Sequence, residues 1–535
     1  MTTGTQFNLL LLPLLTTSPP ARLTLPGVLA ALARDKVDGF AALRPHQTAS
    51  WHMFLVQLAG LALHRAGVAD IPVDEADWAA LLRGLTPGFA GDEPWCLVVK
   101  DTSTPAFLQP AIPDGVTLGN PVETADGLDL LITSRNHDLK QMIARAGAAE
   151  DWIYALVSLQ TGEGYGGAGN QGVVRMNGGS SSRAMVTLAP LSPGEGRAMR
   201  VRPGAWFRRD LQVLLETRDR VLDETALPYA DDGIGLTWLE PWPEGAQLTL
   251  QQLDIWFIEV CRRVRLDMRE GRLAATKGTS RETRIAAKAN KGNLEDPWAP
   301  VHTTEGKSLT IGDEGDFDYE KLTDLLFSGN WTLPLLARRA GFEGAATPLA
   351  IVAQALARGN SKTGGYRSRV VPIESRQLIA EWGEAISQET LRRLAQEQVA
   401  TIRSFDKALG YALVLAAASG EAERISRDSY SLTHAARDQL GRFADTIFFD
   451  HLWRRFAAET KDEAARTAAK TEFAHELWVR TQALFEQALP DMPCHSLYRP
   501  RAEVRARRAL FSRELRESYP QLFQRHDLKE VADHG

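Results

Sequence analysis

The stretch from Gly162 to Gly179 contains the residue types that most clearly suggest a ligand. It reads GEGYGGAGNQGVVRMNGG. Glycine in regular structure is roughly 0.5–1 kcal/mol less favourable than alanine, so a dense run indicates unusual dihedral angles or close approach of the main chain to a ligand. Tyr165, Gln171 and Arg175 interrupt the run with groups that can pack or bond specifically, which argues against a flexible linker. A purely structural turn remains the alternative.

Gly162, Gly164 and Gly167 also match the dinucleotide pattern G-x-G-x-x-G. That pattern has meaning only between a strand and a helix, with an acidic residue about 20 positions further on. Here the preceding residues 151–160 are helical in character, and residues 180–190 contain no carboxylate. The sequence therefore argues against a Rossmann site.

A polar segment, residues 134–145, contains Arg135, Asn136, His137, Asp138 and Lys140. The Asn-His-Asp triplet suggests nuclease chemistry, but no second histidine or carboxylate follows at a recognisable metal-ligand spacing. Two interpretations stay open, a metal-dependent nuclease or nucleotide-binding enzyme and a solvated or RNA-facing loop. No metal site is predicted.

Basic residues are concentrated in two further places. Residues 272–291 are basic and poor in large apolar side chains, which predicts a mobile loop that orders on a partner. A second cluster near the C-terminus has only Glu503 to offset it and is predicted to contact the DNA backbone: Arg499, Arg501, Arg505, Arg507 and Arg508.

Hydrophobic patterning predicts an α+β fold, with a large mixed N-terminal domain at 1–373 and a C-terminal four-helix bundle at 374–535. Residues 46–66 have the apolar spacing of a core helix. Strands are predicted at 7–15, 95–100, 127–133, 184–188 and 234–239. Beyond residue 374 glycine becomes sparse, and amphipathic patterns run through 376–418, 433–458, 464–489 and 500–519.

Composition limits the function classes. The chain has 535 residues and a formal net charge of −6, so it does not hold nucleic acid by bulk charge, and any such contact must be local or shared with partner subunits. Cys96, Cys261 and Cys494 lie too far apart for a zinc module or a disulfide framework. The apolar run at 7–15 is too short to span a membrane. We therefore expect a cytoplasmic protein without membrane attachment.

Several short elements, in this order along the chain, resemble the CasA family, the large subunit of the type I-E CRISPR Cascade complex. They are Phe7-Asn8-Leu9-Leu10, Asn136-His137-Asp138, the glycine stretch running into Arg175-Met176-Asn177-Gly178-Gly179, Gly364-Gly365-Tyr366-Arg367 and the C-terminal helical bundle. Each motif is short, so the resemblance depends on their order and on the domain plan.

The resemblance implies a non-catalytic subunit, without a cofactor, of a CRISPR RNA-guided surveillance complex. Such a subunit recognises the protospacer-adjacent motif in duplex DNA, starts R-loop formation and helps to recruit a helicase-nuclease. The implied partners are the CRISPR RNA, the double-stranded target DNA, and the backbone, 5′-handle-binding and small subunits. The guide RNA then supplies the sequence specificity. A purely structural scaffold subunit remains the alternative.

In the CasA family the glycine loop enters the DNA minor groove beside the protospacer. By similarity, Gly164, Tyr165, Gly166, Gly167 and Ala168 occupy that place, with Gly167 as the closest contact. A groove about 6 Å wide admits bare main chain and has a degenerate hydrogen-bond pattern, which fits tolerance of several related motifs. The polar loop implies RNA or subunit contacts by Arg135, Asn136, His137 and Lys140.

The sequence departs from the family pattern at two positions. Relatives insert a glutamine from a hairpin to split the first base pair, but no glutamine lies nearer to Gly364 than Gln354 and Gln377. We expect Asn360, Lys362 or Arg369 to take that role, with an ordinary surface hairpin as the alternative. A motif-reading lysine of some relatives is also absent from 241–253, and Arg262 and Lys277 are the two candidates to replace it.

Overall fold

The structure is a computed structural model that describes residues 4–129, 147–193, 199–344, 347–359 and 362–523. It divides into two compact units. The first comprises Met1–Phe317 and Gly329–Pro372, and the second comprises Asp318–Ser328 and Ile373–Gly535. The second unit therefore includes a short segment taken from within the sequence of the first.

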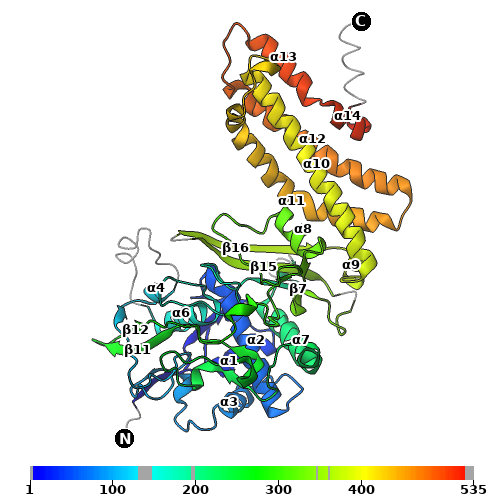
Figure 1. Ribbon diagram of the computed structural model, residues 1–535. Helices are drawn as coiled ribbons and strands as arrows, with labels where there is room; N and C mark the ends of the chain where they lie inside the picture. The colour runs from blue at the N-terminus through cyan, green and yellow to red at the C-terminus, as the bar shows by residue number, and fades with distance from the viewer. Residues whose placement is uncertain (1–3, 130–146, 194–198, 345–346, 360–361, 524–535) are drawn as a thin grey trace. The chain divides into compact units, whose positions relative to one another are not determined.

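Helix α2, which the apolar spacing of residues 46–66 predicts correctly, contacts α3, α6 and α7. The helices of the first unit are α1 (Leu25–Ala33), α2 (Thr48–Ala66), α3 (Glu75–Gly84), α4 (Ala125–Leu128), α6 (Ala149–Gly162) and α7 (Pro203–Glu224) (Figure 1). Gly67 ends α2 in the left-handed conformation at φ +63°, and its N–H bonds back to the last turn. Glycine adopts this conformation without a Cβ clash.

The strands of the first unit form several small sheets rather than one large one. The largest described sheet has the order β16-β15-β7-β8, and another has the order β11-β12-β6. Their strands are β6 (Asn120–Val122), β7 (Met185–Pro193), β8 (Met199–Val201), β11 (Arg263–Arg269), β12 (Arg272–Gly278), β15 (Leu349–Gly359) and β16 (Lys362–Ile373).

The remaining strands pair in short ladders. β1 (Thr5–Asn8) pairs antiparallel with β5 (Cys96–Val99), and β9 (Ile234–Leu236) pairs parallel with β10 (Leu253–Ile258). The other short ladders use β2 (Leu15–Ser18), β3 (Ala21–Leu23), β4 (Gly39–Phe40), β13 (Val301–His302) and β14 (Trp331–Thr332).

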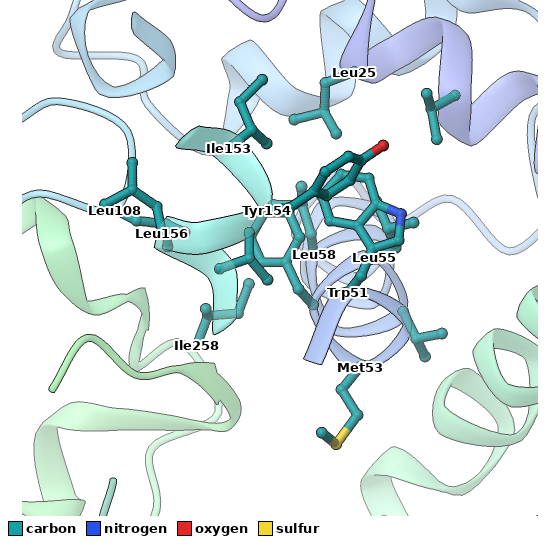
Figure 2. Packing of buried hydrophobic residues seen from close by; sticks show 14 of the residues in the cluster. Leu25, Trp51, Met53, Leu55, Leu58, Leu108, Ile153, Tyr154, Leu156 and Ile258 are labelled. Carbon is teal, nitrogen blue, oxygen red and sulfur yellow. The ribbon is translucent and has the colours of Figure 1, made fainter. Parts of the chain in front are cut away.

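The main core of the first unit lies around α2 (Figure 2). Trp51 of α2 meets Tyr154 of α6 edge to face, with ring centroids 5.0 Å apart. Gln57 of α2 is buried, and its amide nitrogen donates to the carbonyls of Trp256 and Phe257 in β10. These contacts hold α6 and β10 against α2, although the three elements are far apart in sequence. The glycine stretch begins at the end of α6, so α2 helps to set its position.

Two strand predictions in this unit are wrong where the structure describes them. Gly127 and Leu128, at the start of the predicted strand 127–133, lie in α4, since the Thr124 hydroxyl accepts a hydrogen bond from the Gly127 N–H and starts a helix. Residues 130–133 of that prediction lie outside the described residues. The run 7–15 is interrupted after Asn8, whose side chain accepts from the Leu10 N–H at 2.8 Å and turns the chain. β1 ends there and β2 begins at Leu15.

Residues 272–291 are also not the predicted mobile loop. They begin with β12, and Arg284 farther along is only 1% exposed. Its guanidinium donates to the carbonyls of Thr237, Glu240 and Pro241. This segment has few large apolar side chains, and it is held instead by a buried arginine that donates to main-chain carbonyls. Amino-acid composition does not show whether an arginine is buried in this way.

The second unit is helical, as predicted. Its helices are α8 (Tyr319–Phe327), α9 (Arg376–Ala380), α10 (Ala385–Ala417), α11 (His434–Glu459), α12 (Glu463–Ala488), α13 (Arg499–Leu510) and α14 (Arg513–Ser518). α10 contacts α11, α12 and α13. The predicted helix 376–418 is divided into α9 and α10, because Gly383 has φ +90° and breaks the helical path.

The inserted helix α8 packs on α10 and α11. Asp318 caps it, because its carboxylate accepts from the Lys321 N–H at 2.8 Å. Tyr319 stacks on Phe448 of α11 with centroids 4.9 Å apart, and Leu322 is fully buried. The apolar side of α8 thus belongs to the helical core.

Candidate nucleic-acid interface

The glycine stretch is a loop whose two ends are tied together. It leaves α6 at Glu163, which forms an antiparallel bridge with Ser182. The Arg183 N–H donates to the Gly162 carbonyl at 2.8 Å beside this bridge. The stretch is preceded by a helix rather than by a strand, in agreement with the argument against a Rossmann site.

Glycines in the lower part of the loop are required by close packing. A Cβ at Gly164 would lie 2.2 Å from the Ser181 carbonyl oxygen, and one at Gly172 would lie 2.6 Å from the Gly164 carbonyl carbon. Neither neighbour can move without shifting the main chain. Gly164 itself is buried, so the exposed part of the predicted contact segment begins at Tyr165.

The tip of the loop has the opposite character. Tyr165 is 41% exposed, and Gly166 and Ala168 are also exposed. Gly167 has φ +107°, and nothing lies within 4 Å of the place where its Cβ would be. Within the described residues, the N–H groups of Gly167, Ala168 and Gly169 donate no hydrogen bond. The tip therefore presents free main-chain donors and no bulky side chain beyond Tyr165.

A buried carboxylate holds the base of this loop. Glu163 Oε2 lies 3.6 Å from Arg262 Nη2, and Glu163 Oε1 lies 3.3 Å from Arg358 Nη1. The same Arg262 nitrogen donates to the Gly164 carbonyl at 2.7 Å. Burial raises the pKa of Glu163, although the two arginines oppose the shift. This cluster joins the loop to Arg262, just before β11, and to β15.

The end of β12 lies along one side of the loop. A Cβ at Gly169 would fall 2.6 Å from the Thr279 Cβ, and the Gln171 side chain donates to the Arg281 carbonyl at 2.9 Å. Lys277 in β12 is half-buried, and its Nζ donates to the Gly127 carbonyl at 3.3 Å. Burial lowers the pKa of Lys277, and the negative charge of Glu163 opposes that shift.

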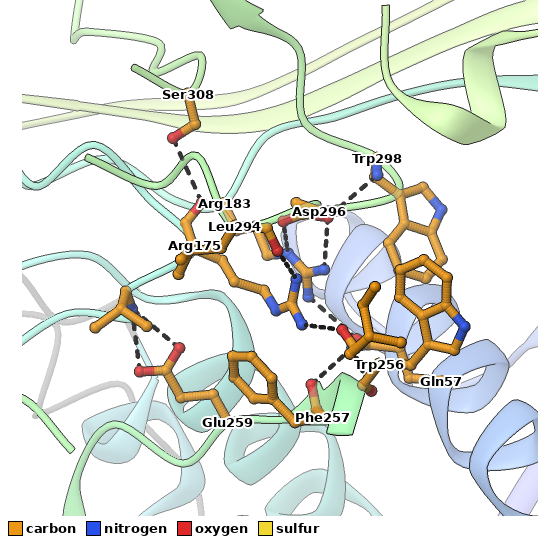
Figure 3. A network of polar contacts seen from close by, with 12 residues as sticks. Gln57, Arg175, Arg183, Trp256, Phe257, Glu259, Leu294, Asp296, Trp298 and Ser308 are labelled. Carbon is orange, nitrogen blue, oxygen red and sulfur yellow. Dashed lines mark hydrogen bonds and ion pairs between the residues drawn. The ribbon is translucent and has the colours of Figure 1, made fainter. Parts of the chain in front are cut away.

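The return segment of the loop is anchored in a buried polar network (Figure 3). Arg183 donates to both carboxylate oxygens of Asp296 at 2.6 and 2.8 Å. Arg175 donates to the carbonyls of Leu294 and Ile255, and its guanidinium lies 4.1 Å from the Phe257 ring centroid. Both arginines are at most 3% exposed, so they stabilise the fold of the return segment and do not contact a ligand.

A second buried carboxylate, Glu259, accepts the Val174 N–H of the same return segment at 2.9 Å. Burial raises its pKa from the ordinary 4.5 to about 7, although the Val174 N–H and the charges of Arg175 and Arg183 offset part of the effect. The carboxylate is thus held in a site that favours its protonated form near neutral pH.

We expect this group to lower stability as pH rises. A folded-state pKa above the unfolded one means that the folded chain binds the proton more tightly, so the contribution of Glu259 is largest below pH 4.5 and is lost as pH rises to about 7. Glu259→Gln keeps the acceptor for Val174 without the charge. Its advantage over the wild type in urea unfolding, followed by tryptophan fluorescence, should be small near pH 4.5 and rise to about 3 kcal/mol at pH 8. An advantage that does not change with pH would contradict this assignment.

Other predicted site residues fall on less informative positions. Arg135, Asn136, His137 and Lys140 lie outside the described residues, as does Asn360. Lys362 begins β16, and Arg369 lies half-buried in the same strand. The β15–β16 hairpin is therefore present, but its side-chain contacts with a duplex remain a prediction.

The C-terminal arginine cluster is largely engaged within the second unit. Arg507 pairs with Glu486 at 2.7 Å, Arg501 pairs with Glu421 at 2.8 Å, and Arg499 and Arg505 donate to main-chain carbonyls. Arg508 is exposed, and its side chain makes no hydrogen bond or ion pair within the described chain. An exposed ion pair contributes only about 0–1 kcal/mol to stability. DNA phosphates could therefore replace the carboxylates as partners of these arginines at little cost in stability.

Two searches of the described residues find nothing. No group of three or more His, Cys, Asp or Glu side chains in them is arranged to hold a metal ion. Nor do they contain a helix with the length and apolar character needed to cross a membrane.

The whole chain resembles several solved structures. Over 98% of its length it matches Thermobifida fusca Cse1 with a TM-score of 0.62 at 14% identity, covering 100% of that chain. It also matches Acidimicrobium ferrooxidans CRISPR-associated protein Cse1 (TM-score 0.59, 16% identity, 94% and 97% covered) and Thermus thermophilus CasA (Cse1) (0.57, 16%, 94% and 99%). The chain has the Cse1 fold.

No protein-family model and no curated protein matches the sequence. At such low identity, the likeness to the Cse1 structures rests on the path of the chain rather than on retained side chains. The expected resemblance to the CasA family is thus confirmed at the level of the fold.

The residues that sequence reasoning missed are those that hold the loop from below. Glu163 is the first residue after α6 and carries no motif, and its partner Arg358 is 195 residues away. The signal available in the sequence is a lone carboxylate inside a glycine run. Arg262 was considered as a base-reading residue, but it is 4% exposed and holds the Gly164 carbonyl.

Proposed function

We propose that this chain is the large subunit of a CRISPR RNA-guided Cascade complex and that its glycine loop recognises the protospacer-adjacent motif in duplex DNA. The observation that carries the proposal is the tip of that loop. Tyr165, Gly166 and Ala168 are exposed, half-buried Gly167 has open space where a side chain would stand, and the main-chain N–H groups of Gly167 and Ala168 have no partner in the described chain. The Cse1 fold supports the same assignment.

The chemistry of the minor groove matches these donors. Every base pair presents acceptor atoms there, at purine N3 and pyrimidine O2, while only guanine adds a donor. Main-chain N–H groups can therefore bond to many sequences, and a wrongly placed guanine amino group would face a donor. Such a loop would read a short motif with tolerance for related ones. Of the two candidates to assist it, half-buried Lys277 fits better than buried Arg262.

The rest of the chain is assigned more coarsely. The β15–β16 hairpin, with Asn360, Lys362 and Arg369, would separate the first base pair and start the R-loop. The polar segment 134–145 would contact the CRISPR RNA or neighbouring subunits. In the second unit, Arg508 and its neighbours would contact the DNA backbone, and the chain would help to recruit the helicase-nuclease. We propose no catalytic role for it.

A gel shift of the reconstituted complex tests the proposal. Two targets that differ only in the flanking motif are compared, each with and without this chain. With the chain, the motif-bearing target should bind at least about 100-fold more tightly, the range that a few good groove contacts provide. Without the chain, the difference should vanish. Equal discrimination by the complex that lacks the chain would refute the proposal.

A further inference from the structure

The base of the glycine loop and the β15–β16 hairpin share one buried ionic cluster. Glu163 gives one carboxylate oxygen to Arg262 and the other to Arg358. Arg358 is the next-to-last residue of β15, at the end of the strand that leads to β16. Its side chain is 15% exposed, so it lies mostly inside the protein rather than on the surface that meets solvent.

Hydrogen bonds from the other end of the loop reach the same strand. The Ser182 hydroxyl accepts the Leu356 N–H at 2.7 Å, and the Ser181 hydroxyl donates to the Leu356 carbonyl at 3.2 Å. Ser182 in turn bridges Glu163. Both ends of the loop are therefore fastened to the last residues of β15.

A continuous path leads from the hairpin to the exposed tip. Arg358 bonds to Glu163, Glu163 faces Arg262, and Arg262 donates to the Gly164 carbonyl. Gly164 immediately precedes the exposed residues that begin at Tyr165. In a site of low dielectric, removing one member of such a set destabilises the arrangement of the others, because a buried charge loses part of its compensation.

We infer that Glu163 is a positioning residue that makes the glycine loop and the β15–β16 hairpin move as one body. A displacement of the loop tip is then transmitted to the end of β15. Resting on the proposed function, the consequence for DNA is that entry of the loop into the minor groove sets the hairpin against the first base pair. Motif recognition and strand separation would be one mechanical event.

The test compares three variants. Arg358→Gln removes the charge that faces Glu163, and Arg358→Lys keeps it. Arg65→Gln is the control, because it removes the same charge in the same unit from a more exposed pair, and the Arg65 guanidinium bonds to Asp232 at 2.8 Å and to the Gly233 carbonyl rather than to the loop or the hairpin. All three are first compared with the wild type as free chains by amide hydrogen exchange.

In Arg358→Gln, the hydrogen-bonded loop amides, those of Tyr165, Gly166, Asn170 and Val173, should exchange about tenfold faster, as expected for the loss of a charge-assisted hydrogen bond that supports a local structure. Arg358→Lys should lie close to the wild type, and Arg65→Gln should not differ from it in this segment. Unchanged exchange of the loop in Arg358→Gln would overturn the inference.

The second readout uses the reconstituted complex and a target with 2-aminopurine at the first base pair beside the motif. Strand opening, followed by fluorescence, should be about tenfold slower with Arg358→Gln and should be restored by Arg358→Lys. Slower opening without faster loop exchange would show a direct DNA contact by Arg358 and would overturn the coupling. If the wild-type complex does not discriminate motifs, the proposed function fails, while the exchange result still decides whether loop and hairpin are coupled.

Discussion

Gly167→Asp is expected to abolish motif-dependent binding by the assembled complex, with a loss of about 100-fold or more. Free space surrounds the missing Cβ, so the side chain fits in the unbound protein, and the main cost to folding is the φ of +107°, about 1 kcal/mol. On DNA the same side chain would fill a groove about 6 Å wide and place a negative charge between two rows of phosphates. The measurement is a gel shift on motif-bearing and motif-lacking targets.

The control for this substitution is Gly67→Asp. Gly67 also has a positive φ, +63°, and nothing lies within 4 Å of its missing Cβ, but it ends α2 far along the chain from the loop. It should leave binding unchanged while also placing an aspartate at a positive φ, with a milder backbone strain than at Gly167. A purely structural scaffold predicts that both variants bind like the wild type. That outcome would reject the role assigned to the loop.

Arg183→Met is expected to give the largest loss of stability, about 3–5 kcal/mol, because it leaves the Asp296 carboxylate buried without its partner. Asp296 is fully buried; burial favours a higher pKa, but the charge and hydrogen bonds of Arg183 outweigh it and hold that pKa below its usual range. Trp298 lies 5.3 Å from the guanidinium, so tryptophan fluorescence during urea unfolding reports on this region.

The double variant Arg183→Met with Asp296→Leu separates charge from packing. Replacing both partners of a buried pair by apolar groups is often nearly neutral, so the double variant should recover most of the lost stability. If it is as unstable as Arg183→Met alone, shape rather than an uncompensated charge accounts for the loss.

Periodic and compositional signals predicted the frame of this protein well. The helix α2 follows from apolar spacing, and the change of composition near residue 374 marks the helical region, because such signals are local and repeated many times. The glycine run indicated an ordered loop, since its interrupting side chains had to pack somewhere. Val174 and Arg175 indeed lie in the buried network behind the tip.

Features set by distant residues were not predicted. Composition made residues 272–291 look unstructured, because the buried Arg284 that orders them is indistinguishable in sequence from a solvated arginine. Thr124 starts a helix that includes Gly127 and Leu128, the first two residues of a predicted strand, through one side-chain hydrogen bond. The cluster around Glu163 depends on Arg262 and Arg358, which approach it only after the strands have paired.

The insertion of α8 has a consequence for how the protein can be taken apart. The polypeptide passes from one unit to the other after Phe317, again after Ser328 and a third time after Pro372. A fragment that starts at Ile373 would lack α8 and would leave bare the helical surface that Tyr319 and Leu322 cover. The C-terminal residues from Ile373 onward therefore do not form the complete helical unit by themselves. Exchanging it between homologues would require transplanting residues 318–328 as well.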